Sequence, residues 1–303
     1  MRPAKLISII IIGLVLLYPL QRSIDRAAPR EAISDESLYL SGATVKKMSL
    51  GLESLAADIY WIRTVQYFGR KLLDSGRPAS SGVSRDIRMD LLAPLLDTIV
   101  TLDSHYLSAY RFGAMFLPER DMPAAIRLLE KGIRENPNEW RLYQDLAFIY
   151  WQAGNGATAE TRAEYYAKAA EWYEKGSDVP GAMWWMRDLA GYMKLQAGSR
   201  EAASAIYSSY LASDDANVRS QAVYRLKQLR SLEEMEAIDA LLARYREQTG
   251  ECPPDLRPLA PKLRAMKFTL NDDQVPVDPE GFPYYVDQTN CKSKLAIEST
   301  IPR

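Results

Sequence analysis

Apolar residues recur at helical spacing through most of this chain, and the clearest stretch, Tyr106–Pro137, predicts two helices. Gly113 and Ala125 are small residues at the points where these helices would cross. Phe112 and Phe116 would fill the space around that crossing. Because one pair of helices cannot bury its own apolar face, further helices should pack against it.

Similar patterns continue on both sides of this stretch. A second pair of helices is predicted from Trp140 and a third from near Trp184. The segment Gln152–Thr161 is expected to form an inserted loop, since it contains Gly154 and Gly156. Four further helical segments are predicted, over Leu50–Gly69, Arg88–Leu102, Val218–Leu229 and Leu232–Thr249.

The spacing of small and large apolar residues resembles the tetratricopeptide repeat, whose consensus unit has about 34 residues. The landmarks of the first unit are Ala109, Phe112, Gly113, Phe116, Ala125, Leu129, Gly132 and Pro137. The resemblance is specific for Tyr106–Pro180 and looser over Leu50–Thr249. It implies an all-α fold with a tetratricopeptide-like solenoid of helix hairpins over residues 49–230. Such stacks usually bind other proteins.

The resemblance also implies a protein-binding groove, because the first helix of each tetratricopeptide unit lines the concave face of the stack. The corresponding residues are Leu107, Tyr110, Ala114 and Leu117, then Arg141, Gln144, Phe148 and Trp151, then Trp185, Asp188, Tyr192 and Leu195. Aromatic residues together with arginine are the types that carry binding energy at interfaces. The alternative is that the closing helices or the C-terminal module bury these aromatic side chains.

The N-terminal region has a different pattern. Leu6–Leu20 contains no charged residue and follows Arg2 and Lys5. Its length lies between that of a signal-peptide core and that of a membrane span. No pair of small residues suits cleavage, since cutting after Ala28 would place Arg26 three residues before the cut. We therefore expect an uncleaved signal-anchor over residues 1–22 and a juxtamembrane linker over residues 23–48. A cleaved signal and a buried N-terminal helix are the alternatives.

Charge and cysteine usage suggest where the chain resides. Arg2 and Lys5 should stay in the cytoplasm, which predicts a single-pass inner-membrane protein with most of the chain in the periplasm. The only cysteines are Cys252 and Cys291. Such a pair in an exported protein often forms a disulfide, although two unrelated thiols are the alternative. With His105 as the sole histidine, the cysteines supply too few ligands for a metal site.

After Thr249 the chain becomes rich in proline, which predicts a closing helix and a small C-terminal module over residues 231–303. Pro253-Pro254-Asp255-Leu256 and Asp278–Tyr285 resemble the ends of type II secretion major pseudopilins. In the second segment Pro279 fixes φ, Gly281 permits a positive φ, and the following residues can pair as a short strand. Related tails hold calcium, for which the candidates are Asp272, Asp273, Asp278 and Asp287. The alternative is that these four are solvated loop acids.

Composition excludes some functions and favours none. The 303 residues include 38 basic and 39 acidic ones, and the net charge of −1 gives no attraction towards nucleic acid. Nucleophile-elbow, P-loop and dinucleotide-binding patterns are absent from the sequence. Glu233, Glu234, Glu236 and Asp239 are interpreted as solvated first turns of a helix. We therefore expect no catalytic residues, no cofactor and no metal.

These patterns together predict a membrane-anchored tetratricopeptide scaffold that mediates protein–protein interactions within a cell-envelope complex, with a secretion or pilus machine as a candidate. The expected partners are other envelope proteins and, through the N-terminal helix, the membrane. Neither nucleic acid nor a small-molecule substrate is expected. One alternative is a structural accessory subunit of a membrane enzyme or electron-transfer complex. Another is a cell-wall or lipid-handling enzyme that uses acids of the tail.

Overall fold

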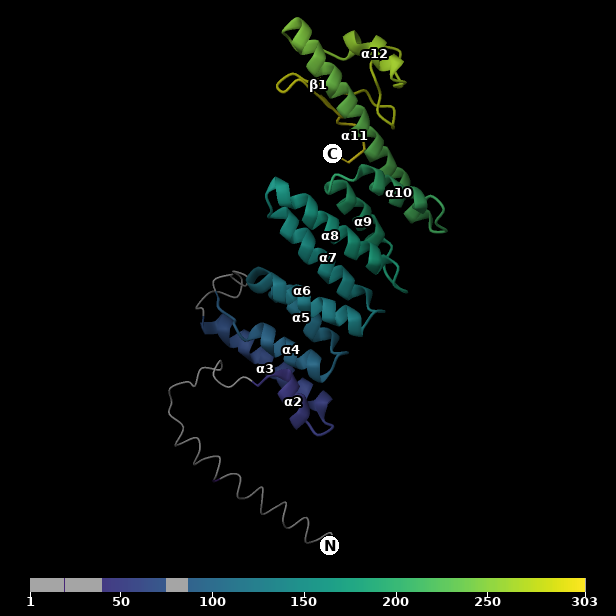
Figure 1. Ribbon diagram of the computed structural model, residues 1–303. Coiled ribbons are helices and arrows are strands. Elements are labelled where there is room, and N and C mark those ends of the chain that lie inside the picture. The colour runs from purple at the N-terminus through teal and green to yellow at the C-terminus, as the bar shows by residue number, and fades with distance from the viewer. Residues whose placement is uncertain (1–18, 20–39, 75–86, 303) are drawn as a thin grey trace. The chain divides into compact units, whose positions relative to one another are not determined.

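The computed structural model describes Pro19 and residues 40–74 and 87–302. Within these residues the chain forms eleven α-helices, one short 3-10 helix and one two-stranded sheet (Figure 1). The predicted all-α class with short strands is therefore confirmed. The predicted anchor, Pro19 apart, and the predicted linker up to residue 39 lie outside the described residues. The rest of the predicted linker is wrong, because Gly42–Met48 forms a helix. In the described part of the chain, no helix combines the length and apolar content needed to cross a bilayer.

The chain divides into two compact units, one ending at Ala109 and the other beginning at Tyr110. The first unit contains α2 (Gly42–Met48), α3 (Glu53–Asp74) and α4 (Leu92–Leu102). Helix α4 contacts both α2 and α3. It is almost wholly apolar, and Leu92, Leu95 and Ile99 are buried against its neighbours. Burial of this one apolar helix therefore holds the first unit together.

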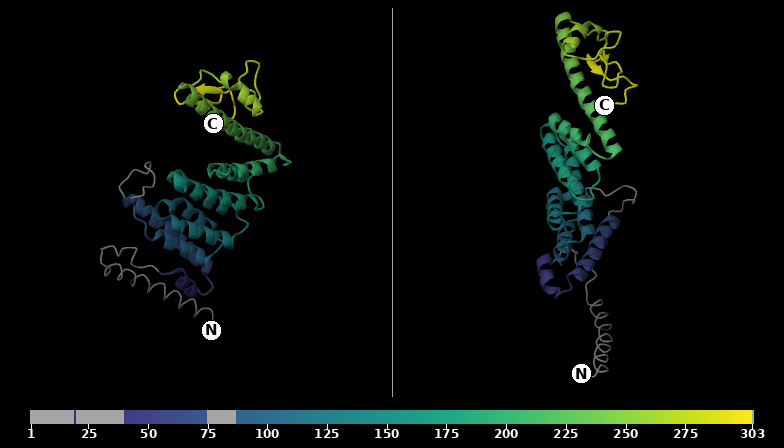
Figure 2. Two further views of the ribbon diagram at one scale, coloured as in Figure 1. Left: turned by 45° about the horizontal axis from the view of Figure 1, so that its top comes forward. Right: turned by 90° about the vertical axis from the view of Figure 1, so that its right-hand side faces the viewer.

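The second unit contains most of the helices. They are the part of α5 (Leu107–Phe116) from Tyr110 onward, α6 (Pro118–Glu135), α7 (Trp140–Asn155), α8 (Ala159–Ser177), α9 (Trp185–Gln196), α10 (Arg200–Tyr210) and α11 (Ala216–Thr249). Each helix from α6 to α11 contacts the next one in the chain (Figure 2). Helix α6 is interrupted at Asp121, whose side chain accepts a hydrogen bond from the Ala124 N–H at 2.9 Å and so begins a second helical segment.

Tyrosine rings packed over helical glycines join neighbouring helices of the second unit. Tyr110 lies over Gly132, Tyr166 over Gly154, and Tyr207 over Gly191. The three tyrosines are all buried. A glycine lets the ring approach the backbone of the opposite helix directly, so the two helices can pack closely.

Alanine at Gly191 should therefore destabilise the second unit by about 1–3 kcal/mol, although alanine favours helix more than glycine does. A Cβ at this position would lie 2.7 Å from Cε1 and Cζ of Tyr207. The Tyr207 ring is 1% exposed and has little room to move. The free energy of unfolding in urea measures this effect. Gly156→Ala is the matched control in the same unit, because its nearest neighbour would be 3.9 Å away. Equal effects from the two substitutions would contradict this account of the packing.

The predicted loop over Gln152–Thr161 is wrong in extent. Helix α7 continues to Asn155 and α8 already begins at Ala159, so only residues 156–158 connect them. The first turns of α8 are exposed to solvent. Their sequence, Ala-Glu-Thr-Arg-Ala-Glu, consists mostly of good helix formers, so the extra residues lengthen the helix instead of forming a loop.

The two predicted closing helices are in fact one, since α11 runs unbroken through Leu229–Leu232. Asp215 caps its start by accepting from the Asn217 N–H at 2.8 Å. Gly250, at φ +82°, ends it in the left-handed conformation. No glycine or proline lies between these two residues, so nothing in the sequence breaks the helix.

Helix α11 belongs to two apolar cores. Its first half contributes Val218, Ala222 and Leu229 to a cluster with α9 and α10. Its second half contributes Ile238, Leu241 and Leu242 to the core of the C-terminal module. The helix therefore crosses the predicted boundary at residue 230, and it lays the module along its own second half (Figure 2).

The C-terminal module consists of η3 (Arg257–Leu259), α12 (Ala260–Ala265), β1 (Tyr285–Asp287) and β2 (Lys292–Lys294). The two strands are antiparallel, with Val286 opposite Ser293. Cys252 and Cys291 form a disulfide, with their Cα atoms 5.7 Å apart. Polar contacts hold β2 on α11, where the Asp239 carboxylate accepts from the Ser293 N–H at 2.6 Å and from its hydroxyl at 2.7 Å.

Candidate functional site

Helix α7 has one buried face and one face that reaches solvent. The buried face includes Leu142, Leu146, Ile149 and Tyr150. The opposite face carries Arg141, Gln144, Phe148 and Trp151, which is the predicted groove set of this helix. Phe148 is 44% exposed. We call these four residues the α7 face.

Aromatic contacts fix the geometry of the α7 face. The Phe148 and Trp151 rings meet edge to face, with centroids 5.8 Å apart. The Arg141 guanidinium lies 4.6 Å from the Trp140 ring centroid. Trp140 in turn meets Trp185 of α9 edge to face at 5.9 Å. The aromatic side chains are therefore positioned by one another before any ligand binds.

An ion pair lies beside the α7 face. Arg111 of α5 donates from Nε to the Asp145 carboxylate of α7 at 3.0 Å. Burial raises the pKa of the Asp145 carboxyl, and the Arg111 guanidinium opposes that rise. One turn further along α5, Met115 is 72% exposed. The sequence pattern did not indicate Arg111, Met115 and Asp145, because each lies one position away from a groove position of the tetratricopeptide repeat.

The first predicted groove helix does not offer the side chains expected of it. Tyr110 has no exposed surface, because its ring lies over Gly132, and Leu117 is also buried. Both residues belong to the core, which corrects their assignment to a groove. Leu107 is half-buried and lies in the first unit, and Ala114 is half-buried in the second.

The third predicted groove helix is closed by α11. Asp188 accepts from Arg225 of α11 at 3.1 and 3.2 Å. The same guanidinium lies 5.7 Å from the Tyr192 ring centroid. Leu195 packs against the apolar cluster of α10 and α11. The alternative of burial by a closing helix therefore describes these three residues, and Trp185 of this helix contacts α7 through Trp140.

A hollow of about 330 Å³ lies elsewhere in the second unit, between the turn before α9, the end of α10 and the start of α11. Trp184, Arg187 and Tyr210 line it. The Arg187 guanidinium is already paired, at 2.5 Å, with Asp178 and hydrogen-bonded at 3.2 Å to Ser177. Arg187, the charged side chain that lines the hollow, is therefore engaged in contacts with neighbouring residues of the protein.

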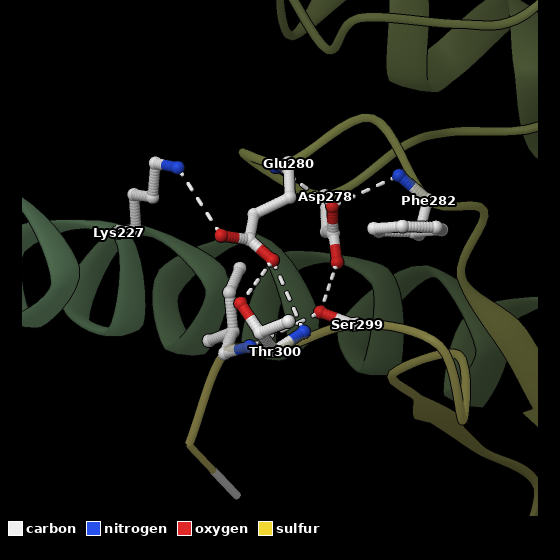
Figure 3. Close-up of polar contacts among 7 residues, drawn as sticks. Lys227, Asp278, Glu280, Phe282, Ser299 and Thr300 are labelled. Atoms are coloured by element: carbon white, nitrogen blue, oxygen red, sulfur yellow. Dashed lines mark hydrogen bonds and ion pairs between the residues drawn. The ribbon is translucent and has the colours of Figure 1, made fainter.

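Two of the four candidate calcium ligands, Asp278 and Asp287, are engaged in structural contacts, whereas Asp272 and Asp273 are exposed to solvent. Asp278 accepts from the N–H groups of Glu280 and Phe282 and from the Ser299 hydroxyl (Figure 3). Lys294 pairs with Asp287 at 2.8 Å. Among the residues that the structure describes, no group of three or more acids, histidines or cysteines could hold a metal ion. The calcium alternative therefore finds no clustered ligand set there.

Three of the four acids of α11 also have partners, which corrects their interpretation as solvated first turns, while Glu233 is exposed as expected. Glu236 forms a two-point ion pair with Arg200 at 2.7 and 2.9 Å. Glu234 accepts from the buried Tyr284 hydroxyl at 2.8 Å. Glu236 therefore holds α10 on α11, and Glu234 and Asp239 hold the tail on it. The sequence signal for this role was a cluster of acids in the middle of a long helical pattern.

Comparison with known proteins adds no relative, since no protein-family model matches the chain and no curated protein is similar to it. The tetratricopeptide resemblance therefore stays a prediction.

Proposed function

We propose that the chain is a membrane-anchored tetratricopeptide-type scaffold, which binds a partner protein of the cell envelope on the α7 face. The N-terminal apolar segment would hold it in the inner membrane, with the helical body in the periplasm. The disulfide supports this placement, because such bonds persist in oxidising compartments. The contacts between consecutive helices and the tyrosine–glycine packing support a solenoid.

The aromatic pair of the exposed Phe148 and the half-buried Trp151 carries the binding proposal. Truncation of aromatic anchors at a protein interface often costs 2 kcal/mol or more, that is, roughly a thirtyfold loss of affinity. The neighbouring Arg141, Arg111 and Asp145 would supply a polar rim around the pair. Their opposite charges favour a partner surface that combines an apolar patch with both signs of charge.

The double substitution Phe148→Ala/Trp151→Ala should reduce partner recovery at least tenfold, since loss of an aromatic anchor at an interface weakens binding strongly. The chain should stay folded. The measurement is purification of the tagged full-length chain from its native membranes in mild detergent, followed by quantitative mass spectrometry. Tyr285→Ala is the matched control, because Tyr285 is an exposed aromatic of the C-terminal module. Tyr110 is unsuitable for this test, since its loss would damage the core.

The same preparation separates the proposal from its alternatives. Partners that the folded double variant retains in full would contradict the α7 face as the binding surface. A set of partners present at a fixed one-to-one ratio, and kept by the double variant, would instead indicate a structural accessory subunit.

A further inference from the structure

Helix α3 in the first unit carries a row of apolar side chains that face solvent. Leu55, Ile59, Ile62 and Leu73 are each more than half exposed. Their spacing places them on one side of the helix. Leu52, just before α3, adds a fifth exposed side chain. We call these five residues the α3 stripe.

The α3 stripe is additional to the face that α3 uses for folding. Ala57, Thr64, Tyr67 and Phe68 form the buried face of the helix. That face packs against α4, which completes the core of the unit. From Leu55 to Leu73 the stripe spans about 27 Å. The polar Gln66 interrupts this line between Ile62 and Leu73, so Leu55, Ile59 and Ile62 form its uninterrupted part. An exposed apolar cluster of this kind marks an interaction surface.

Charged residues flank the stripe. Arg63 and Arg70 lie along one edge and Asp58 along the other, as the helical positions place them. An apolar row beside basic residues is typical of helices that lie in the membrane interface, where anionic headgroups attract lysine and arginine.

The sequence before α3 brings a bilayer within reach. Leu6–Leu20 is the uncharged segment that we propose as the anchor. Twenty residues lead from Leu20 to Leu40, and a chain of that length spans at most about 70 Å. The anchor would therefore hold α3 close to the membrane surface at a high effective concentration.

We propose that the α3 stripe lies on the membrane surface, with its aliphatic side chains inserted at the boundary between headgroups and acyl chains. This inference rests on the anchor in the proposed function. A second copy of the chain is a weaker occupant, because a stable dimer interface needs about 20–30 residues a side. A single row of five side chains on one helix is much narrower than that.

Fluorescence quenching in vesicles tests the proposal with the full-length chain. A polarity-sensitive dye is attached at Gln66→Cys, an exposed position in line with the stripe that leaves all five apolar side chains in place. A second sample carries the dye at Ser54→Cys, an exposed position about a third of a turn around the same helix. Both are reconstituted into vesicles of phosphatidylcholine and phosphatidylglycerol, with and without brominated acyl chains.

We expect brominated lipids to quench the dye at position 66 several-fold more than the dye at position 54. The substitutions Leu55→Ser, Ile59→Ser and Ile62→Ser together should abolish that difference, while circular dichroism shows an unchanged helical content. A dye at position 66 that lipid does not quench would overturn the proposal. The emission of the dye at position 66 could also shift to the blue as the protein-to-lipid ratio rises, without quenching by brominated lipid. That result would overturn the proposal and indicate that a second copy of the chain covers the α3 stripe.

Flotation of the same vesicles on a density gradient separates the two proposals. If the chain floats with the vesicles but the dye at position 66 is not quenched, the anchor is supported and only the proposal for the α3 stripe is overturned. A chain that fails to float overturns the anchor and, with it, the inference about α3.

Discussion

Replacing both Cys252 and Cys291 with serine should lower the free energy of unfolding of the C-terminal module by about 4 kcal/mol. The disulfide closes a loop with a sequence separation of 39 residues. In the chain-entropy model, a loop of that length restricts the unfolded chain by roughly that amount. A small module has few other means of reaching net stability, so the loss should unfold it at temperatures where the helices of the second unit persist.

The site of the bond explains why the effect should stay local. Cys291 is buried among Leu256, Leu259 and Tyr284, in the core that the tail forms on α11. The Gln288 side chain also ties the two ends of the loop together, since it donates to the Pro253 carbonyl at 2.9 Å. This contact remains in the serine variant, so the module should be weakened without losing its register.

Chemical unfolding, followed by hydrogen exchange of the module and of α7 separately, measures the difference. A variant with alanine at both positions is the control, because it removes the bond without placing a hydroxyl in the core. If both variants unfold within 1 kcal/mol of the parent chain, the bond is not a main source of stability. Reduction of the parent chain should reproduce the effect of the substitutions.

The sequence predicted most helices because their apolar spacing is strong and local. The segments around α4, α5 and α7 match within a few residues, since α5 and α7 each have a single buried face and α4 is apolar almost throughout. The unbroken α11 was missed because its buried face changes along its length. The first half faces the α9–α10 cluster and the second half faces the tail, so no single stripe runs through the whole helix. In the sequence, a shift of the buried face from one side of a helix to another looks the same as the end of one helix and the start of the next.

The candidate site was harder to predict for the same reason. Phe148 and Trp151 reach solvent as expected, but Tyr110 is a core residue because Gly132 leaves room for its ring. That pairing joins residues 22 positions apart, and no local pattern shows which aromatic meets which glycine. Asp188 and Tyr192 likewise depend on Arg225, which comes from a later helix. Offsets carried over from a repeat family locate the helices but do not establish which side chains remain exposed.

Replacing Asp278 with alanine should destabilise the C-terminal module by about 3–5 kcal/mol, because one buried carboxylate organises the whole turn that follows it. Asp278 is 4% exposed. One of its oxygens accepts from the Glu280 N–H at 2.8 Å and from the Phe282 N–H at 3.0 Å. The other accepts from the Ser299 hydroxyl at 2.6 Å (Figure 3). Alanine would leave these three donors without that acceptor.

The turn explains why the sequence Asp-Pro-Glu-Gly-Phe occurs here. Gly281 adopts φ +91°, which glycine tolerates best, and its N–H donates to the Asp278 carbonyl at 2.9 Å. Glu280 is thereby placed to accept from the Thr300 hydroxyl at 2.7 Å and from Lys227 of α11 at 3.2 Å. The carboxylates of Asp278 and Glu280 thus connect the turn with the C-terminal residues, and that of Glu280 also connects it with the long helix.

Asp278→Asn is the matched control, and we expect it to cost only about 1 kcal/mol. Its amide oxygen can still accept from both backbone N–H groups, and its NH₂ can donate to the Ser299 oxygen. Unfolding free energies of the two variants, with hydrogen exchange at Glu280 and Phe282, make the comparison. Fast exchange at both amides in the alanine variant alone would support the hydrogen-bond account. Equal losses in the two variants would contradict it, because the negative charge of the carboxylate would then be the stabilising feature.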